Sequence, residues 1–344
     1  MKGLLAKVHS RERGVVIIWI AFFMITMLGF VALGIDVAKV MATRTELQNA
    51  ADAAALAGAS AVDVATGNIV QNTAVGRAQA TAADNKAFVN EPLPVQLLGS
   101  DVSFPTTKQC KVTVRRDAGA GGEMVTHVAQ VLGIKSMSLS ATATAEASPA
   151  SGICNKLAPM GAIPATGKPT DFLPGCANQY TLKQGQGGGS QGNYQALDFP
   201  APCNDGACAG YSQTGANTYR CLLANGYGCC VSVGQKLQTE PGNMTGPTRQ
   251  GLQDLWDGDT DRRSGICYEN YTGNNNRIVN VPIISAPGNG RTDVTVLAFA
   301  AFYLKVRPSG GSSQPVTGEF INLVAPGTGG GPTGSTLFSL RLVK

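Results

Sequence analysis

The acidic segment DLWDGDTDRRSG carries the side chains best suited to bind a metal ion. Asp257, Asp259 and Asp261 stand at alternate positions, the spacing with which an EF-hand calcium loop begins. That loop also needs glycine at its sixth position and a bidentate glutamate at its twelfth, where this chain has Arg262 and Tyr268. The segment is therefore a calcium candidate that departs from the pattern at two positions, and a solvated turn is the alternative.

Cysteines supply the other reactive side chains. Eight of the nine lie between residues 154 and 267, in a glycine-rich segment, and Cys110 stands alone. An even number of cysteines in such a segment predicts disulfides in an oxidising compartment, with the pairing left open. Zinc held by thiolates is the alternative, but both histidines lie outside this region. Cys110 is expected to be either buried and free or paired between chains. The disulfide candidates are Cys154, Cys176, Cys203, Cys208, Cys221, Cys229, Cys230 and Cys267.

No motif in the sequence indicates catalysis. The chain lacks a GxSxG elbow, a Walker loop, an HExxH helix and a dinucleotide-binding fingerprint. A Ser-His-Asp or Cys-His arrangement outside the N-terminal segment would have to use His127. We therefore expect a protein that is not an enzyme and that uses no cofactor. An envelope hydrolase with paired carboxylates such as Asp257 and Glu269 is an alternative without a motif.

The formal net charge of +5 does not indicate a nucleic-acid-binding protein. Only 14% of the residues are charged, and no basic face is evident outside the N-terminal segment. Because nucleic-acid binding depends on such a face, this class of partner is excluded.

Residues 15–35 form an uncharged run of 21 residues that precedes all these groups. As a helix the run would span roughly 31 Å, which matches the hydrocarbon core of a bilayer. A cleavable signal peptide is the alternative, but its apolar region is usually only about 7–15 residues long. The positive-inside rule leaves residues 1–14 cytoplasmic, because basic residues precede the span: Lys2, Lys7, Arg11 and Arg13. The chain from Asp36 onward is then expected outside the cytoplasm.

The helical pattern continues beyond the span. No proline occurs before Pro92, and residues 50–61 are almost all alanine, glycine or serine. Alanine has the highest helix propensity, so a single helix is predicted from Val15 to about Val64. Ala50, Ala54 and Gly58 recur at every fourth position and form a ridge of low side-chain height, against which another helix can pack closely. The ridge is expected to pack either on a partner subunit or on the chain's own domain.

These segments together resemble a known family. RERG, the apolar span and GIDVAKVMATRTELQNAADAAALAGA are similar to the N-terminal region of Flp (tight-adherence) pilus-assembly proteins of the TadG-like kind. The most specific part is Leu47–Ala59, and the similarity covers about residues 11–60, with weaker similarity to about residue 147. The resemblance implies a bacterial inner-membrane protein, related to pseudopilins, whose partners are the bilayer and, through the N-terminal helix, other pilus-assembly proteins. It also allows a homo-oligomer.

The chain departs from pseudopilins of this system at the processing site. Those proteins are cut after a glycine that is followed, at the fifth position, by glutamate. Gly14 fits the pattern, but Trp19 stands at the fifth position. The span is therefore expected to remain as an anchor.

The expected fold class is α+β, with four parts after the cytoplasmic tail 1–14. A single transmembrane helix at 15–35 continues into a pilin-like helix, and residues 36–150 form a helical stalk and a small α+β unit. Residues 151–326 form a mostly β, disulfide-rich extracytoplasmic domain, and residues 327–344 form a flexible glycine-rich tail. Within 36–150 we expect helices at 68–88 and 123–132 and strands at 95–104, 110–115 and 137–147. Beyond residue 151 we expect strands at 194–199, 230–237, 278–284, 294–306 and 319–324, of which 294–306 is buried on both faces.

Two hypotheses about function follow from this organisation. The first is a non-enzymatic, membrane-anchored component of a Flp/Tad pilus-assembly apparatus, with its C-terminal domains in the periplasm. The second is an envelope-anchored adhesin whose disulfide-stapled β domain recognises a glycan or a protein.

Overall fold

The computed structural model describes residues 13–87, 93–154, 156–183, 196–200, 208, 210–211, 215–242, 244–308 and 315–343. Most of the predicted cytoplasmic tail, Cys203 and the segment GQGGGSQG at 185–192 lie outside the described residues. The α+β fold class is confirmed: a long N-terminal apolar helix is followed by mixed helices, extensive sheets and a disulfide-rich β region. The chain divides into two compact units, the first comprising Met1–Ala57, Val75–Ser103 and Lys111–Thr144, and the second Gly58–Ala74, Phe104–Cys110 and Ala145–Lys344.

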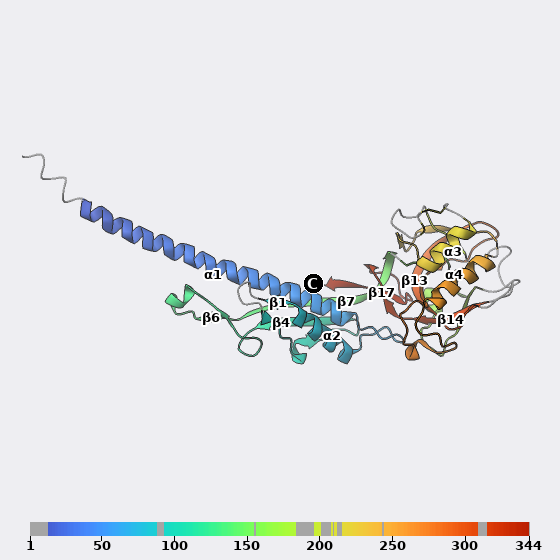
Figure 1. The fold of residues 1–344 in the computed structure, drawn as a ribbon, viewed down its shortest axis with the longest axis horizontal. Helices are drawn as coiled ribbons and strands as arrows, with labels where there is room; N and C mark the ends of the chain where they lie inside the picture. Colours follow the sequence, from blue (N-terminus) through green and yellow to red (C-terminus); the bar gives the residue numbers. More distant parts are fainter. Residues whose placement is uncertain are drawn as a thin grey trace, which may run out of the picture. The chain divides into compact units, whose positions relative to one another are not determined.

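The longest element is helix α1, Arg13–Ala59, shown in blue in Figure 1. It ends five residues before the predicted Val64 because a tight turn follows it. The Asp63 carboxylate accepts hydrogen bonds from the backbone N–H groups of Ala65 and Thr66, at 3.1 and 2.7 Å. Gly67 then adopts a left-handed conformation with φ 71°, which favours glycine. These local contacts compete with continuation of the helix.

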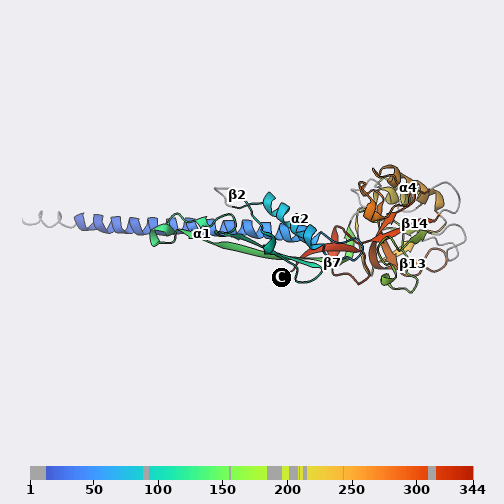
Figure 2. The same cartoon turned by 90° about the horizontal axis from the view of Figure 1, so that it is seen from below.

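The first unit combines most of α1 with most of helix α2, Gln71–Asp84, and short β segments. Strand β7, Leu139–Cys154, begins in this unit, where the Gln48 amide of α1 lies 3.4 Å from the carbonyl of Thr142, and Figure 2 shows the strand and the helix. The remaining elements of this part of the chain are β1 Lys86–Ala87, β2 Leu93–Pro94, η1 Gly99–Asp101, β3 Val102–Ser103, β4 Gln109–Arg116, β5 Met124–Val125, η2 Ala129–Leu132 and β6 Ser136–Met137.

The predicted helix at 123–132 is wrong. The segment instead forms a hairpin of β5 and β6 around the short 3₁₀ helix η2, which Gly133 closes in a left-handed conformation with φ 89°. Two physical reasons explain the difference. β-branched residues such as Val125, Thr126 and Val128 have reduced helix propensity. In addition, the Asp36 carboxylate accepts hydrogen bonds from three successive backbone N–H groups of this segment.

The core of the second unit is a six-stranded sheet in the order β8-β14-β13-β11-β9, with β12 also paired to β13. β12 (Ile278–Ile284) and β13 (Asp293–Leu304) pair antiparallel over most of their length. As expected from its continuous apolar run, β13 is buried on both faces, with Phe299 and Phe302 in two different hydrophobic clusters. The other strands are β8 Tyr180–Lys183, β9 Leu197–Asp198, β11 Lys236–Thr239 and β14 Val316–Ile321, with short helices η3 Pro169–Asp171 and η4 Tyr268–Asn270.

Two helices that the sequence analysis missed cover one face of this sheet. They are α3, Ala216–Asn225, and α4, Thr245–Asp257, which lie next to each other in Figure 1. Gly251 allows their close approach, because a Cβ at this position would lie 3.0 Å from the Leu223 side chain. Tyr219 of α3 accepts a hydrogen bond from Thr248 of α4 at 3.2 Å.

The C-terminal segment is not a flexible tail. Residues 327–344 contain strands β16 Gly327–Gly329 and β17 Leu337–Val343, and the predicted domain boundary near residue 150 lies inside β7. β7 pairs with β17, with β16 and with β10, Cys230–Ser232. On its other side β17 pairs in parallel with β15, Leu323–Val324. A Cβ at Gly327 would lie only 2.1 Å from the carbonyl oxygen of Gly152. The glycines therefore permit close backbone packing in a sheet.

Candidate functional site

Within the described part of the chain, nothing covers the N-terminal half of α1. The large apolar side chains from Val16 to Ile35 are exposed, and Trp19 is the most exposed of them at 72%. The described residues contain one helix that is long and apolar enough to cross a membrane, and it is this one. Exposure of so many contiguous apolar side chains to water would be strongly unfavourable. The helix therefore indicates single-pass membrane anchoring.

One face of the C-terminal half of the same helix is buried within the chain. Ala50 and Ala54 are fully buried, and Gly58 is buried as well. A Cβ at Gly58 would lie 2.5 Å from the Cys110 sulfur and 3.4 Å from the carbonyl oxygen of Ala74. The chain thus occupies its own small-residue ridge, and packing of a partner subunit against Ala50, Ala54 and Gly58 remains a prediction.

Cys110 is the residue that fills the space left by Gly58. It is a free cysteine and fully buried. Burial raises the pKa of its thiol to about 11, because an apolar environment disfavours the thiolate. A thiol of this kind is unreactive while the fold is closed.

Asp36 marks the point on α1 where the exposed and buried parts meet. Its carboxylate is 4% exposed and accepts hydrogen bonds from the backbone N–H groups of His127, Val128 and Ala129, at 3.0, 2.8 and 2.8 Å. One turn further on, the Lys39 ammonium donates to the carbonyl of Val125 at 3.3 Å. A buried carboxylate is stable only when it is fully hydrogen-bonded, so Asp36 fixes the hairpin to α1.

The acidic segment after α4 forms a buried ionic cluster in the second unit. Asp259 and Arg277 are both almost inaccessible, and the Arg277 Nε lies 3.9 Å from the Asp259 carboxylate. The guanidinium also lies over three rings, 4.2 Å from the centre of Trp256, 4.9 Å from Tyr271 and 5.0 Å from Tyr303. Tyr271 donates its hydroxyl to Asp259, and burial raises the pKa of Tyr303 to about 12.

The other two carboxylates of the calcium candidate pair with different arginines. Asp261 binds Arg263 at 2.6 Å, and this hydrogen bond holds the pKa of Asp261 well below its usual range. Asp257 binds Arg307 at 2.7 Å at the surface. Arginine side chains thus already neutralise all three aspartates of the calcium candidate, and this arrangement favours a structural turn over a cation site.

Disulfides connect distant parts of the second unit. Cys154 bonds to Cys230 across β7 and β10, and Cys208 bonds to Cys221 on α3. Cys229 is also disulfide-bonded. Since Cys230 is held by Cys154, the two adjacent cysteines have different partners.

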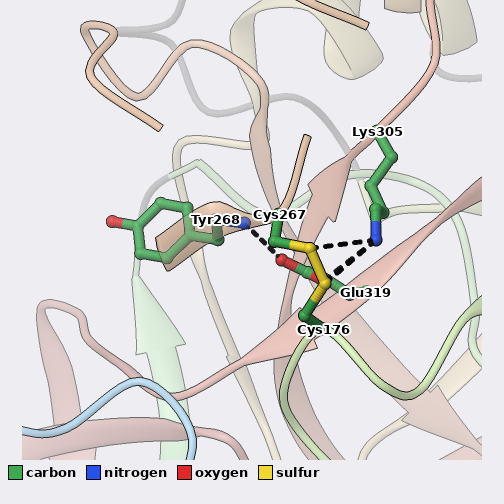
Figure 3. The surroundings of a disulfide bond; sticks show 5 residues. All are labelled: Cys176, Cys267, Tyr268, Lys305 and Glu319. Carbon is green, nitrogen blue, oxygen red and sulfur yellow. Dashed lines mark hydrogen bonds and ion pairs between the residues drawn. A yellow bond between two sulfur atoms is a disulfide. The ribbon is translucent and has the colours of Figure 1, made fainter. Parts of the chain in front are cut away.

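The disulfide between Cys176 and Cys267 lies beside a buried ion pair, as Figure 3 shows. The Lys305 ammonium lies 3.6 Å from the sulfur of Cys176, 3.7 Å from that of Cys267 and 3.4 Å from the Glu319 carboxylate. Glu319 also accepts the backbone N–H of Tyr268 at 2.5 Å. Among the described residues, potential metal ligands gather within 4.8 Å of one another at Cys176, Cys267 and Glu319. Because the two sulfurs are bonded to each other and an ammonium lies beside them, the arrangement is that of a structural cross-link.

The comparison with known families identifies the first part of the chain. Residues 14–61 match the Tad family model, described as "Putative Flp pilus-assembly TadE/G-like". The predicted resemblance is confirmed, and the match indicates a component related to pilus assembly. This Tad segment, residues 14–61, contains the exposed apolar half of α1, Asp36 and the buried ridge, and it ends two residues after the helix. No curated protein and no solved structure matches the chain.

Several structurally important residues could not have been selected from the sequence. Arg277, Lys305 and Glu319 are charged residues in otherwise ordinary segments, and their burial depends on contacts with distant residues. Asp36 did carry a signal, because it is the first charged residue after the span. Its three backbone partners lie more than 90 positions away and carry no signal in their side chains.

Proposed function

We propose that this chain is a non-enzymatic, membrane-anchored scaffold of a bacterial Flp/Tad pilus-assembly apparatus. The observation that carries the proposal is the division of α1 within the Tad segment. The part up to Ile35 is apolar and exposed, while the part from Ala50 to Ala59 is largely buried in the chain's own fold. A helix of this design holds a folded extracytoplasmic region at the membrane surface.

The orientation follows from charge. Lys2, Lys7, Arg11 and Arg13 precede the span, so we place the N-terminus in the cytoplasm and the residues after Asp36 in the periplasm. Disulfides in the second unit support an oxidising compartment. Reporter fusions after residue 64 should be active only with a reporter that functions in the periplasm. Activity of a cytoplasmic reporter at this position would contradict the orientation.

Contacts with other pilus-assembly proteins would then use the exposed part of α1. Gly29 and Gly34 have open space at their Cβ positions, whereas Gly58 does not. Gly34→Leu should therefore weaken co-purification of pilus-assembly proteins and leave the fold unchanged. Ala54→Leu should instead lower the melting temperature, because Ala54 is fully buried. Loss of co-purification for Ala54→Leu with an unchanged melting temperature would indicate that the ridge is the interface.

Complementation of a deletion strain tests the scaffold function as a whole. The wild-type gene should restore pili, and a version in which residues 15–35 are replaced by a cleavable export signal should not. Normal pilus number with the exported version would reject a role that depends on anchoring.

An adhesin is the second candidate, and one feature of the second unit favours it. A polar hollow of about 390 Å³ lies over α3 and is lined by Tyr211, Asn217, Arg220 and Asp254 among others. An exposed tyrosine beside charged and amide side chains is suited to glycan binding. Deletion that leaves pili normal but reduces attachment to surfaces would support this function over the scaffold.

A further inference from the structure

The β5–β6 hairpin, residues 124–137, has one buried and one exposed set of side chains. Met124 and Thr126 are almost fully buried. The exposed side chains include the apolar Val125, at 53%, and Ile134, at 49%, beside the polar His127, Gln130 and Lys135, while Met137, at 38%, lies opposite Met124 and so on the other face. Strand pairing of Met124 with Met137 and of Val125 with Ser136 holds these residues in one short hairpin. The first unit therefore presents an apolar surface that its own core does not cover.

The hairpin is attached to α1 at a defined position along the helix axis. Its backbone N–H groups at His127, Val128 and Ala129 bind the Asp36 carboxylate, one residue after the apolar span. Lys39 adds a hydrogen bond to the carbonyl of Val125. In Figures 1 and 2 the hairpin lies beside α1 and is directed toward the N-terminal half of the helix.

This attachment point, Asp36, lies at the boundary of the bilayer if residues 15–35 span it. A helix rises about 1.5 Å per residue, so Asp36 lies within roughly 2 Å of the end of the span. The headgroup layer on each side of a bilayer is roughly 5–7 Å thick. If residues 15–35 span the hydrocarbon core, the attachment point of the hairpin lies within the headgroup layer.

We propose that the β5–β6 hairpin is a second membrane contact, which inserts Val125 and Ile134 into the leaflet where α1 emerges. Exposed Lys135, next to Ile134, contacts lipid phosphates. Apolar side chains flanked by a basic residue are the usual composition of a surface that lies in the membrane interface. This inference rests on the membrane anchoring proposed above.

Lipid is the occupant that the geometry favours over a protein. The hairpin is attached to α1 at Asp36, and the two neighbours of Asp36 on the helix, Ile35 and Val37, are exposed at 58% and 47%. A hairpin fixed at Asp36 has the bilayer beside it whenever α1 spans the membrane. Two contacts with one leaflet would also restrict the tilt of α1, which a single span leaves free.

The test measures the depth of the hairpin in a bilayer with the full chain. Ile134→Cys in a Cys110→Ala background is spin-labelled after reconstitution into vesicles of phosphatidylethanolamine and phosphatidylglycerol. The label should collide with oxygen, which is enriched in lipid, and be several-fold less accessible to a water-soluble nickel complex than the control label. The matched control is Leu173→Cys, an apolar position in the second unit that is 58% exposed. Lys135→Glu should increase the nickel accessibility of the label at 134, most strongly in vesicles that contain phosphatidylglycerol.

Each contrary outcome has a clear meaning. Equal nickel accessibility at positions 134 and 173, in chains that resist carbonate extraction, would overturn the hairpin proposal and leave anchoring intact. Release of the chain by carbonate would overturn the anchoring itself. Spin–spin broadening that increases with the protein-to-lipid ratio would assign the surface to a second copy of the chain and also overturn the proposal.

Discussion

Gly58→Ala should destabilise the fold although alanine is the better helix former. The added Cβ would lie 2.5 Å from the sulfur of Cys110 and 3.5 Å from its Cβ. Overpacking of a core in this way costs about 1–3 kcal/mol. The intrinsic preference of a helix for alanine over glycine offsets roughly 0.5–1 kcal/mol of this cost. A net loss of about 1–2 kcal/mol corresponds to a roughly 5- to 30-fold larger open population.

The free thiol provides the assay. Cys110 is buried and its pKa is raised, so a thiol reagent modifies it only after local opening. When closing is faster than modification, the labelling rate of the native full chain in detergent follows the open population. Labelling of Gly58→Ala should therefore be about 5- to 30-fold faster than that of the wild type. Gly76→Ala is the matched control, because this helical glycine has no neighbour within 4 Å of its Cβ position. Its labelling should not accelerate.

A double variant separates the steric clash from other effects. Cys110→Ala removes the sulfur and leaves the Ala74 carbonyl oxygen, at 3.4 Å, as the nearest atom to the new methyl group. Gly58→Ala should then cost far less stability in the Cys110→Ala background than in the wild type, as measured by urea unfolding. Equal costs in the two backgrounds, or wild-type labelling of Gly58→Ala, would refute the claim that Gly58 is required by Cys110.

Three further predictions concern the second unit and the thiols. Lys305→Met should lower the free energy of unfolding by about 3–5 kcal/mol in urea, because it leaves the buried Glu319 carboxylate unpaired, and Glu319→Gln should restore part of the loss. Because Arg263 depresses the pKa of Asp261, the unfolded chain binds a proton more readily near the ordinary pKa of 3.8. Stability should thus fall as the pH drops below about 4, and Asp261→Asn should flatten this acid limb in melts measured against pH. Alkylation of the unfolded, non-reduced chain should label Cys110 and, among the described cysteines, no other; labelling of a second cysteine among them would contradict the disulfide assignment.

The sequence could predict the elements whose signal is local. Val15–Ile35 is uncharged throughout, and its helix needs no other part of the chain to be recognised. The predicted strand at 278–284 coincides with β12. Its ends could be predicted because polar turns flank the apolar run. The extent of β13 was also close, since a continuous apolar run of this length is typical of a strand buried on both faces.

The missed helices α3 and α4 depend on contacts between distant residues. α3 follows Gly215 and α4 contains Gly246 and Gly251, so local helix propensity is weak in both. They are stabilised because Gly251 lets them approach each other and because Leu223 and Trp256 are buried against the sheet. A packing partner supplied by the fold outweighs a weak propensity.

The acidic segment shows why a local motif is weak evidence for a binding site. Asp259 and Asp261 have the spacing of a calcium loop, but the charges that balance them come from Arg277 and Arg263. Arg277 lies 18 positions after Asp259 and is held there by aromatic rings from α4, β13 and the intervening loop. The sequence shows carboxylates that could bind a metal ion. It does not show that the fold places arginine side chains beside them.

The small-residue ridge at Ala50, Ala54 and Gly58 is likewise weak evidence for a partner surface. A row of alanine and glycine permits close packing, and it permits it equally for a partner subunit and for the chain's own strands. Burial favours the chain's own packing: Ala50 and Ala54 have no exposed surface, and the Cys110 sulfur occupies the space beside Gly58, so a partner subunit on this ridge remains a prediction. Since the same helix is exposed up to Ile35, most of its apolar surface that is left for lipids and partners lies before Asp36, with Val37 and Met41 as exposed apolar positions beyond it. The buried carboxylate of Asp36 is therefore the physical boundary between the part of α1 that the membrane must cover and the part that the chain covers itself.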